Sequence, residues 1–214
     1  MTFELWLLLT SALLAGAISP GPSLALVLRT AITQNRLSAL VVAFAHGLGI
    51  TVYALAVVFG LVKVLESVSS ALMLLQAGGV VFLLFLGYQM FSGGIKAKGL
   101  GAADVPGERP TDSAGEPLIQ HVTNGFLIVF LNPKVAIFFV AIFSQFFNQE
   151  QTLGTQLVAA GLAGIIDTLW YVLVAMFASN HRFATRLRAL SPLLDVAFGL
   201  LFIVFAVFGL FSLL

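Results

Sequence analysis

The sequence contains no cysteine, and only 9% of its 214 residues carry a charged side chain. Without cysteine the chain has no disulfides, no thiolate metal ligands and no cysteine nucleophile. Charges this sparse could not cover the surface of a soluble domain of this size. The net charge of +1 also gives no reason to expect a nucleic-acid partner.

What the sequence has in excess is apolar side chains. Hydrophobic residues make up 60% of the chain, and the mean hydropathy of +1.08 lies outside the range of soluble globular domains. Six stretches with at most one charged residue are each long enough to cross about 30 Å of hydrocarbon. They are residues 5–28, 37–62, 67–95, 123–147, 155–179 and 192–214. The sequence therefore predicts an all-α membrane protein with six transmembrane helices, whose main partner is the lipid bilayer.

Basic residues are distributed unevenly between the loops that join these stretches. The loops after the first, third and fifth stretches hold eight lysines or arginines, whereas the other loops hold only Lys63. Because basic residues stay on the cytoplasmic side, this bias predicts that both termini lie outside. A signal peptide cleaved near Ala17 is the alternative for the first stretch. Such a cleavage would leave Arg29 and Arg36 outside, contrary to the distribution of basic residues between the loops.

The two halves of the chain show similar patterns. The apolar run that begins at Gly79 is matched at Gly199, an offset of 120, and two proline-containing interruptions in the first and fourth stretches lie about 112 apart. We therefore expect a first three-helix repeat over residues 1–95, a cytoplasmic loop rich in glycine, proline and charge over 96–120, and a second repeat over 121–214. Because each repeat has three spans, the second is expected to be inverted relative to the first.

The interruptions are expected to break the first and fourth helices. Pro20, Gly21 and Pro22 stand in the first, and Asn132 with Pro133 in the fourth. Proline lacks a backbone donor and clashes with the preceding turn. In transporters, paired breaks of this kind place half-helix N-termini near the middle of the membrane, where they can bind a carboxylate. A simple packing kink is the alternative, because glycine and proline are frequent in transmembrane helices.

Four polar side chains within or beside the spans are candidates for a site, and a fifth, Asp195, is not. Asp167 lies in mid-span, where an acid costs about 2.5–3.5 kcal/mol, and could couple protons, bind a substrate ammonium or form a structural ion pair. Lys134 could pair with Asp167, bind a substrate carboxylate or reach the interface. His46 could relay protons or be a hydrogen-bonded structural residue, and Asn132 could satisfy the broken backbone or contact substrate. Asp195, near the start of the sixth stretch, is predicted to be a helix N-terminal charge.

The motifs Ser19-Pro20-Gly21-Pro22-Ser23, His46-Gly47-Leu48-Gly49 and Leu131-Asn132-Pro133-Lys134, followed by Asp167, resemble those of the LysE family of amino-acid exporters. The likeness is greatest to its RhtB-like branch. This resemblance implies a secondary transporter of the bacterial inner membrane that exports amino acids or close derivatives, with protons as the exchanged ion. It implies no cofactor and no metal, and it is compatible with a homodimer. The residues it assigns to substrate binding or coupling are Pro20, Gly21, Pro22, Ser23, His46, Asn132, Pro133, Lys134 and Asp167.

Two other classes of protein are weighed against a transporter. An intramembrane hydrolase could use Ser19 or Ser23 with His46 and Asp167, but the sequence has no Gly-x-Ser-x-Gly elbow and no His-Glu-x-x-His, and the serines flank the proline interruption with no adjacent base. A non-catalytic membrane subunit would have no need of Asp167 within a span. The chain also lacks a phosphate-binding loop with Lys-Ser/Thr, so ATP is not expected to drive it directly.

Overall fold

The computed structural model describes residues 1–19, 21–67, 69–100, 117–147, 151–178 and 181–211. Within these residues there are eight helices and no strands, which confirms the predicted all-α class. The helices are α1 Phe3–Ile18, α2 Pro22–Thr33, α3 Arg36–Ser67, α4 Ser69–Leu100, α5 Leu118–Leu131, α6 Pro133–Phe146, α7 Leu153–Phe177 and α8 His181–Phe211.

Four of these helices, α3, α4, α7 and α8, are long and apolar enough to cross a membrane individually. The other four form two bent pairs, α1 with α2 at 53° and α5 with α6 at 58°. Each pair, taken as one span, is also long and apolar enough to cross a membrane. The described chain therefore has four candidate spans, or up to six if each bent pair is one crossing. Many large apolar side chains face outward, as a lipid-facing surface requires, among them Leu74, Leu131 and Phe211.

The two bends lie where the sequence predicts broken helices. Gly21 precedes α2 with an extended backbone, and Pro22 is the first residue of α2, where its missing N–H costs no intrahelical bond. Pro133 starts α6 in the same way. Asn132 is the C-cap residue of α5 and the N-cap residue of α6. Its Oδ1 accepts a hydrogen bond from the Lys134 backbone N–H at 3.1 Å. Pro20 lies outside the described residues.

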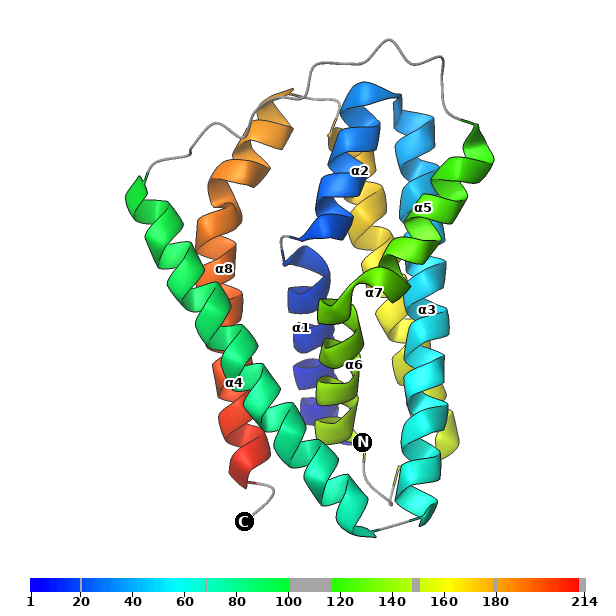
Figure 1. Cartoon of the computed structure of the whole chain (residues 1–214), viewed down its shortest axis with the longest axis vertical. Coiled ribbons are helices and arrows are strands. Elements are labelled where there is room, and N and C mark those ends of the chain that lie inside the picture. The colour runs from blue at the N-terminus through cyan, green and yellow to red at the C-terminus, as the bar shows by residue number, and fades with distance from the viewer. Residues whose placement is uncertain (20, 68, 101–116, 148–150, 179–180, 212–214) are drawn as a thin grey trace.

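Figure 1 shows the helices running roughly along one long axis, with both termini at the same, lower end of the molecule. The α2–α3 junction lies at the opposite end, and α1 and α6 run next to each other through the middle. The most extensive helix pairs are α4 with α8 and α3 with α7, and α3 also packs on α5. The two bends are thereby brought to a similar height, between the α4–α8 pair and the α3–α7 pair.

The α3–α7 contact is reciprocal. A Cβ on Gly47 would overlap the hydroxyl of Thr168, and a Cβ on Gly164 would overlap the hydroxyl of Thr51. Each threonine stands one turn after the glycine of its own helix and donates to that glycine's carbonyl, at 2.9 Å from Thr51 to Gly47 and 2.7 Å from Thr168 to Gly164. Only glycine allows the two backbones to approach this closely, as is common in membrane helices.

The α4–α8 contact is reciprocal as well. A Cβ on Gly87 would lie 2.7 Å from the carbonyl oxygen of Gly199, and a Cβ on Gly199 would lie 2.6 Å from that of Gly87. These two glycines are 112 positions apart. Gly79, which the sequence matched with Gly199 at an offset of 120, instead faces Ser144 and Ala141 of α6.

Two expected boundaries differ from the structure. Helix α4 continues to Leu100, so Lys96 lies on a helix, and of the expected loop over 96–120 the residues 101–116 lie outside the described part. Helix α8 begins at His181 and runs through Pro192. The prediction that Asp195 is a helix N-terminal charge is therefore wrong, because more than three turns of helix precede it.

A column of phenylalanines forms the core between the bends and the end that carries the termini. Phe139, Phe143 and Phe147 follow one face of α6, with ring centroids 5.5 Å and 4.7 Å apart. Phe202 of α8 packs against the same helix, and its exposed fraction is 0%, as is that of Phe143. This part of the interior is apolar and closely packed.

Candidate functional site

A cavity lies at the level of the two bends. Residues of α1, α2, α3, α6, α7 and α8 line it, together with Ser19, Gly21 and Asn132 at the bends themselves. Water-sized molecules can reach about 50 Å³ of its interior, which is room for only a few waters at roughly 10–15 Å³ each. Its polar lining side chains are Ser19, Ser23, His46, Asn132, Lys134, Asp167 and Tyr171.

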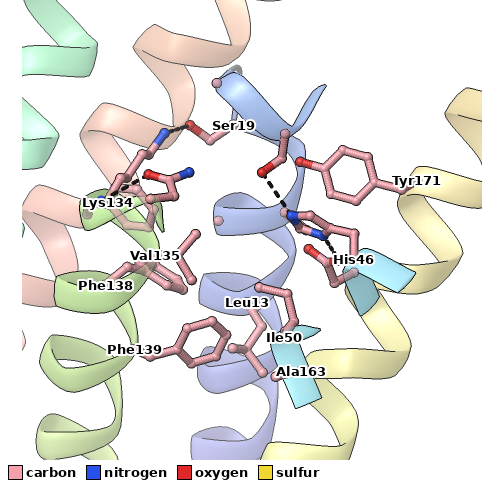
Figure 2. A pocket seen from close by; sticks show the side chains of 17 residues that line it. Leu13, Ser19, His46, Ile50, Lys134, Val135, Phe138, Phe139, Ala163 and Tyr171 are labelled. Atoms are coloured by element: carbon pink, nitrogen blue, oxygen red, sulfur yellow. Dashed lines mark hydrogen bonds and ion pairs between the residues drawn. The ribbon is translucent and has the colours of Figure 1, made fainter. Parts of the chain in front are cut away.

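A chain of hydrogen bonds forms one wall of the cavity (Figure 2). His46 of α3 contacts Asp167 of α7 through Nδ1 and Oδ2 at 2.6 Å, and its Nε2 contacts the Ser23 hydroxyl of α2 at 2.8 Å. Tyr171 lies one turn after Asp167 and also lines the cavity, and its ring meets the His46 ring edge-on at 4.7 Å. Each of these four residues is at most 5% exposed.

The donor and acceptor roles along this chain follow from the charge states. When Asp167 is ionised and His46 is neutral, Nδ1–H donates to the carboxylate and Nε2 accepts from the Ser23 hydroxyl. When His46 is protonated, both nitrogens donate, and Ser23 must turn its lone pairs toward the ring. The arrangement can therefore take up or release a proton by rotating one hydroxyl, without moving a helix.

Lys134 lies on the other side of the cavity, at the start of α6. Its Nζ donates to the Ser19 hydroxyl at 2.5 Å, so that the two bends are joined by one hydrogen bond. It also interacts electrostatically with Asp195 of α8. Of the three roles considered for Lys134, pairing with Asp167 is not what the structure shows, because the carboxylate of Asp167 is bonded to His46.

The structure brings together six of the residues expected from the sequence. Gly21, Ser23, His46, Asn132, Lys134 and Asp167 line the cavity. Pro22 and Pro133 are the first residues of the two half-helices whose N-termini face it.

Comparisons with known proteins identify the family of the chain. Residues 14–212 match the family model described as LysE type translocator. The chain belongs to this family. It is 27% identical over 206 residues to a threonine efflux protein of Escherichia coli K12, covering 95% of this chain and 97% of the relative. It is 28% identical over 208 residues to a homoserine/homoserine lactone efflux protein of Salmonella typhimurium, covering 94% of each. No solved structure matches it.

Membership of the LysE type translocators confirms the resemblance found in the sequence, and the protein is a multi-pass membrane transporter and not an enzyme. One argument against the hydrolase was nevertheless wrong. Ser23 does have a base beside it, since His46 and Asp167 reach it in the order of a Ser-His-Asp triad. A triad alone is therefore not evidence of hydrolysis, because the same hydrogen bonds serve a translocator.

Tyr171, Ser19 and Asp195 were not assigned to the transport site from the sequence. Tyr171 carried a signal, because it follows Asp167 by four residues and so lies on the same face of a helix. Ser19 directly precedes the first proline interruption. Asp195 gave no such signal, since its partner Lys134 is on a different helix.

Proposed function

We propose that this LysE-type translocator is a secondary transporter of the bacterial inner membrane that exports small amino acids from the cytoplasm in exchange for protons. The amino-acid cargo is supported by the efflux relatives, which are named for threonine and for homoserine and its lactone. The observation that carries the proposal is the buried chain from Asp167 through His46 to Ser23, which ends at the broken first span.

The buried carboxylate of Asp167 is the proposed coupling group. An acid within a span costs about 2.5–3.5 kcal/mol, and an asparagine could hydrogen-bond to His46 with no charge to bury. Asp167 is only 5% exposed, and through His46 it is connected to a hydroxyl at the break between α1 and α2. A proton bound here can be exchanged with whichever side the cavity opens to.

The opposite wall is the proposed site for the substrate carboxylate. Lys134 supplies a positive charge, and the N-termini of α2 and α6 add the partial positive charge of their helix dipoles. Ser19 and Asn132 supply hydrogen-bonding groups beside the lysine. A zwitterionic amino acid placed across the cavity would then direct its ammonium toward Asp167.

Transport is proposed to follow an inverted-repeat mechanism, with repeats over residues 1–95 and 121–214. Its support is the two bends of similar angle and the two reciprocal glycine contacts, α3 with α7 and α4 with α8. At the end that carries the termini, Gln145 donates to the Gln76 carbonyl at 2.8 Å and Gln76 to the Ser144 carbonyl at 3.0 Å. These α4–α6 bonds would have to open when the cavity faces that end.

The proposed orientation places both termini outside. Its support is the eight-to-one bias of basic residues between the two sets of loops. The termini also lie together at one end of the molecule (Figure 1).

The test is transport by the purified protein in proteoliposomes. Vesicles loaded with one labelled amino acid at a time are followed with and without a pH gradient. We expect efflux of threonine or homoserine that speeds up when the gradient drives protons in the opposite direction. Efflux that does not respond to the gradient would reject proton exchange, and no efflux of any amino acid would reject the proposed cargo.

A further inference from the structure

The cavity has an apolar side that the proposed binding and coupling roles do not use. Phe138 of α6 lines it, with Leu13 and Gly16 of α1 and Ile50 of α3 nearby in the lining (Figure 2). We propose that Phe138, seated on Gly16, sets the upper size of the amino-acid side chain that the translocator carries. This inference rests on the proposed function and names the substrate class as amino acids with small, uncharged side chains.

The ring of Phe138 is held tightly in place. A Cβ on Gly16 would lie 2.6 Å from its Cζ and 2.9 Å from its Cε1, so the tip of the ring touches the backbone of α1. The Phe139 ring meets it edge-on with the ring centroids 5.5 Å apart, and the Phe202 ring packs against it with the centroids 5.7 Å apart. The ring is 6% exposed. A side chain that enters the cavity therefore meets a rigid wall, and the ring cannot turn aside without displacing a neighbour.

The chemistry of this wall selects against charge as well as size. Leu13, Ile50, Val135 and Phe139 complete it, and none of them carries a hydrogen-bonding side chain. A second charged group on the substrate would be buried here without a partner, which is strongly unfavourable. The charged ends of the amino acid are accommodated only at the polar walls.

Gly16 and Phe138 offer two substitutions with opposite effects. Phe138→Leu removes part of the ring and enlarges the cavity next to α1. Gly16→Ala adds a methyl group where the ring tip already touches, so the ring must move and the space contracts. Because alanine is also the better helix former, Gly16→Ala has no local cost to the helix itself.

The experiment measures competition in proteoliposomes loaded with equal concentrations of labelled glycine, threonine and leucine. We expect the wild type to export glycine and threonine well and leucine poorly. Phe138→Leu should raise the leucine-to-threonine ratio by about tenfold, the scale of a methylene-sized change in a pocket. Gly16→Ala should lower the threonine-to-glycine ratio.

Phe147→Leu is the matched control. It is the same substitution at the end of the same helix, at a ring that is 1% exposed and does not line the cavity. It should leave both ratios at their wild-type values. Unchanged ratios in a transporting Phe138→Leu variant would overturn the inference, as would an equal shift in Phe147→Leu. If Phe138→Leu proves unstable in detergent, Gly16→Ala decides alone, and an unchanged threonine-to-glycine ratio rejects the inference. A wild type that exports no amino acid would instead reject the proposed function.

Discussion

Asp167→Asn separates a coupling role of this carboxylate from a structural one. The variant keeps the shape of the side chain and an acceptor for His46 Nδ1–H, but it cannot titrate. A hydrogen bond to a charged group contributes about 1.5–3 kcal/mol and one between neutral groups about 0.5–1.5 kcal/mol. The 2.6 Å contact with His46 should therefore weaken by on the order of 1–2 kcal/mol.

This loss is small because Asp167 bonds to His46 and not to Lys134. Lys134 bonds to Ser19 and has Asp195 as its electrostatic partner, so the variant strands no buried cation, which would cost roughly 3–5 kcal/mol. We expect a folded, inserted protein whose melting temperature falls by only a few degrees, at roughly 2–4 °C per kcal/mol. Export driven by a pH gradient should be abolished.

The assay combines flux in proteoliposomes with thermal unfolding in detergent. Tyr171→Phe is the companion variant, since it removes a hydroxyl from the same wall of the cavity, one turn from Asp167, and leaves the carboxylate in place. It should slow export but preserve the response to the gradient. Gradient-driven export by Asp167→Asn at the wild-type rate would refute the coupling role, and loss of folding would show that the carboxylate is needed for structure.

Three further predictions follow from the site, the helix contacts and the charge bias. Lys134→Met should raise the KM for amino acids at least tenfold with a smaller effect on kcat, because it removes the proposed carboxylate contact; an unchanged KM in flux assays would contradict this. Gly47→Ala should destabilise the protein by about 1–3 kcal/mol through overpacking, and adding Thr168→Gly should restore most of that stability. If the two substitutions changed the melting temperature additively, the result would argue against the contact. Single cysteines at Thr2 and Ala103 should be labelled by an impermeant maleimide in intact cells at Thr2 only, and labelling of Ala103 from outside would reverse the proposed orientation.

The helices and their two bends could be predicted from the sequence because both depend on local properties. A bilayer requires long stretches without charge, and a proline cannot continue the hydrogen bonds of the preceding turn. Pro192 shows the limit of that reasoning. It lies inside α8, and a proline alone does not say whether the helix resumes on the far side, so Asp195 was placed at a helix start.

The candidate site was predictable as a set of residues but not as an arrangement. His46 and Asp167 are 121 positions apart, and their contact depends on which faces of α3 and α7 meet. The glycine and threonine pairs at the same spacing in both helices, Gly47 with Thr51 and Gly164 with Thr168, determine that facing. The spacing can be read from the sequence, but only the structure shows that the two helices contact each other at these residues.

The phenylalanine column beneath the site also has an electrical consequence. Phe139, Phe143 and Phe147 are at most 4% exposed, so this face of α6 is packed with apolar rings between the bends and the end that carries the termini. A membrane potential falls across the part of a protein that excludes water, and moving one charge through 100 mV is worth about 2.3 kcal/mol. We infer that in the proposed transporter these rings concentrate the voltage drop over a few turns of helix.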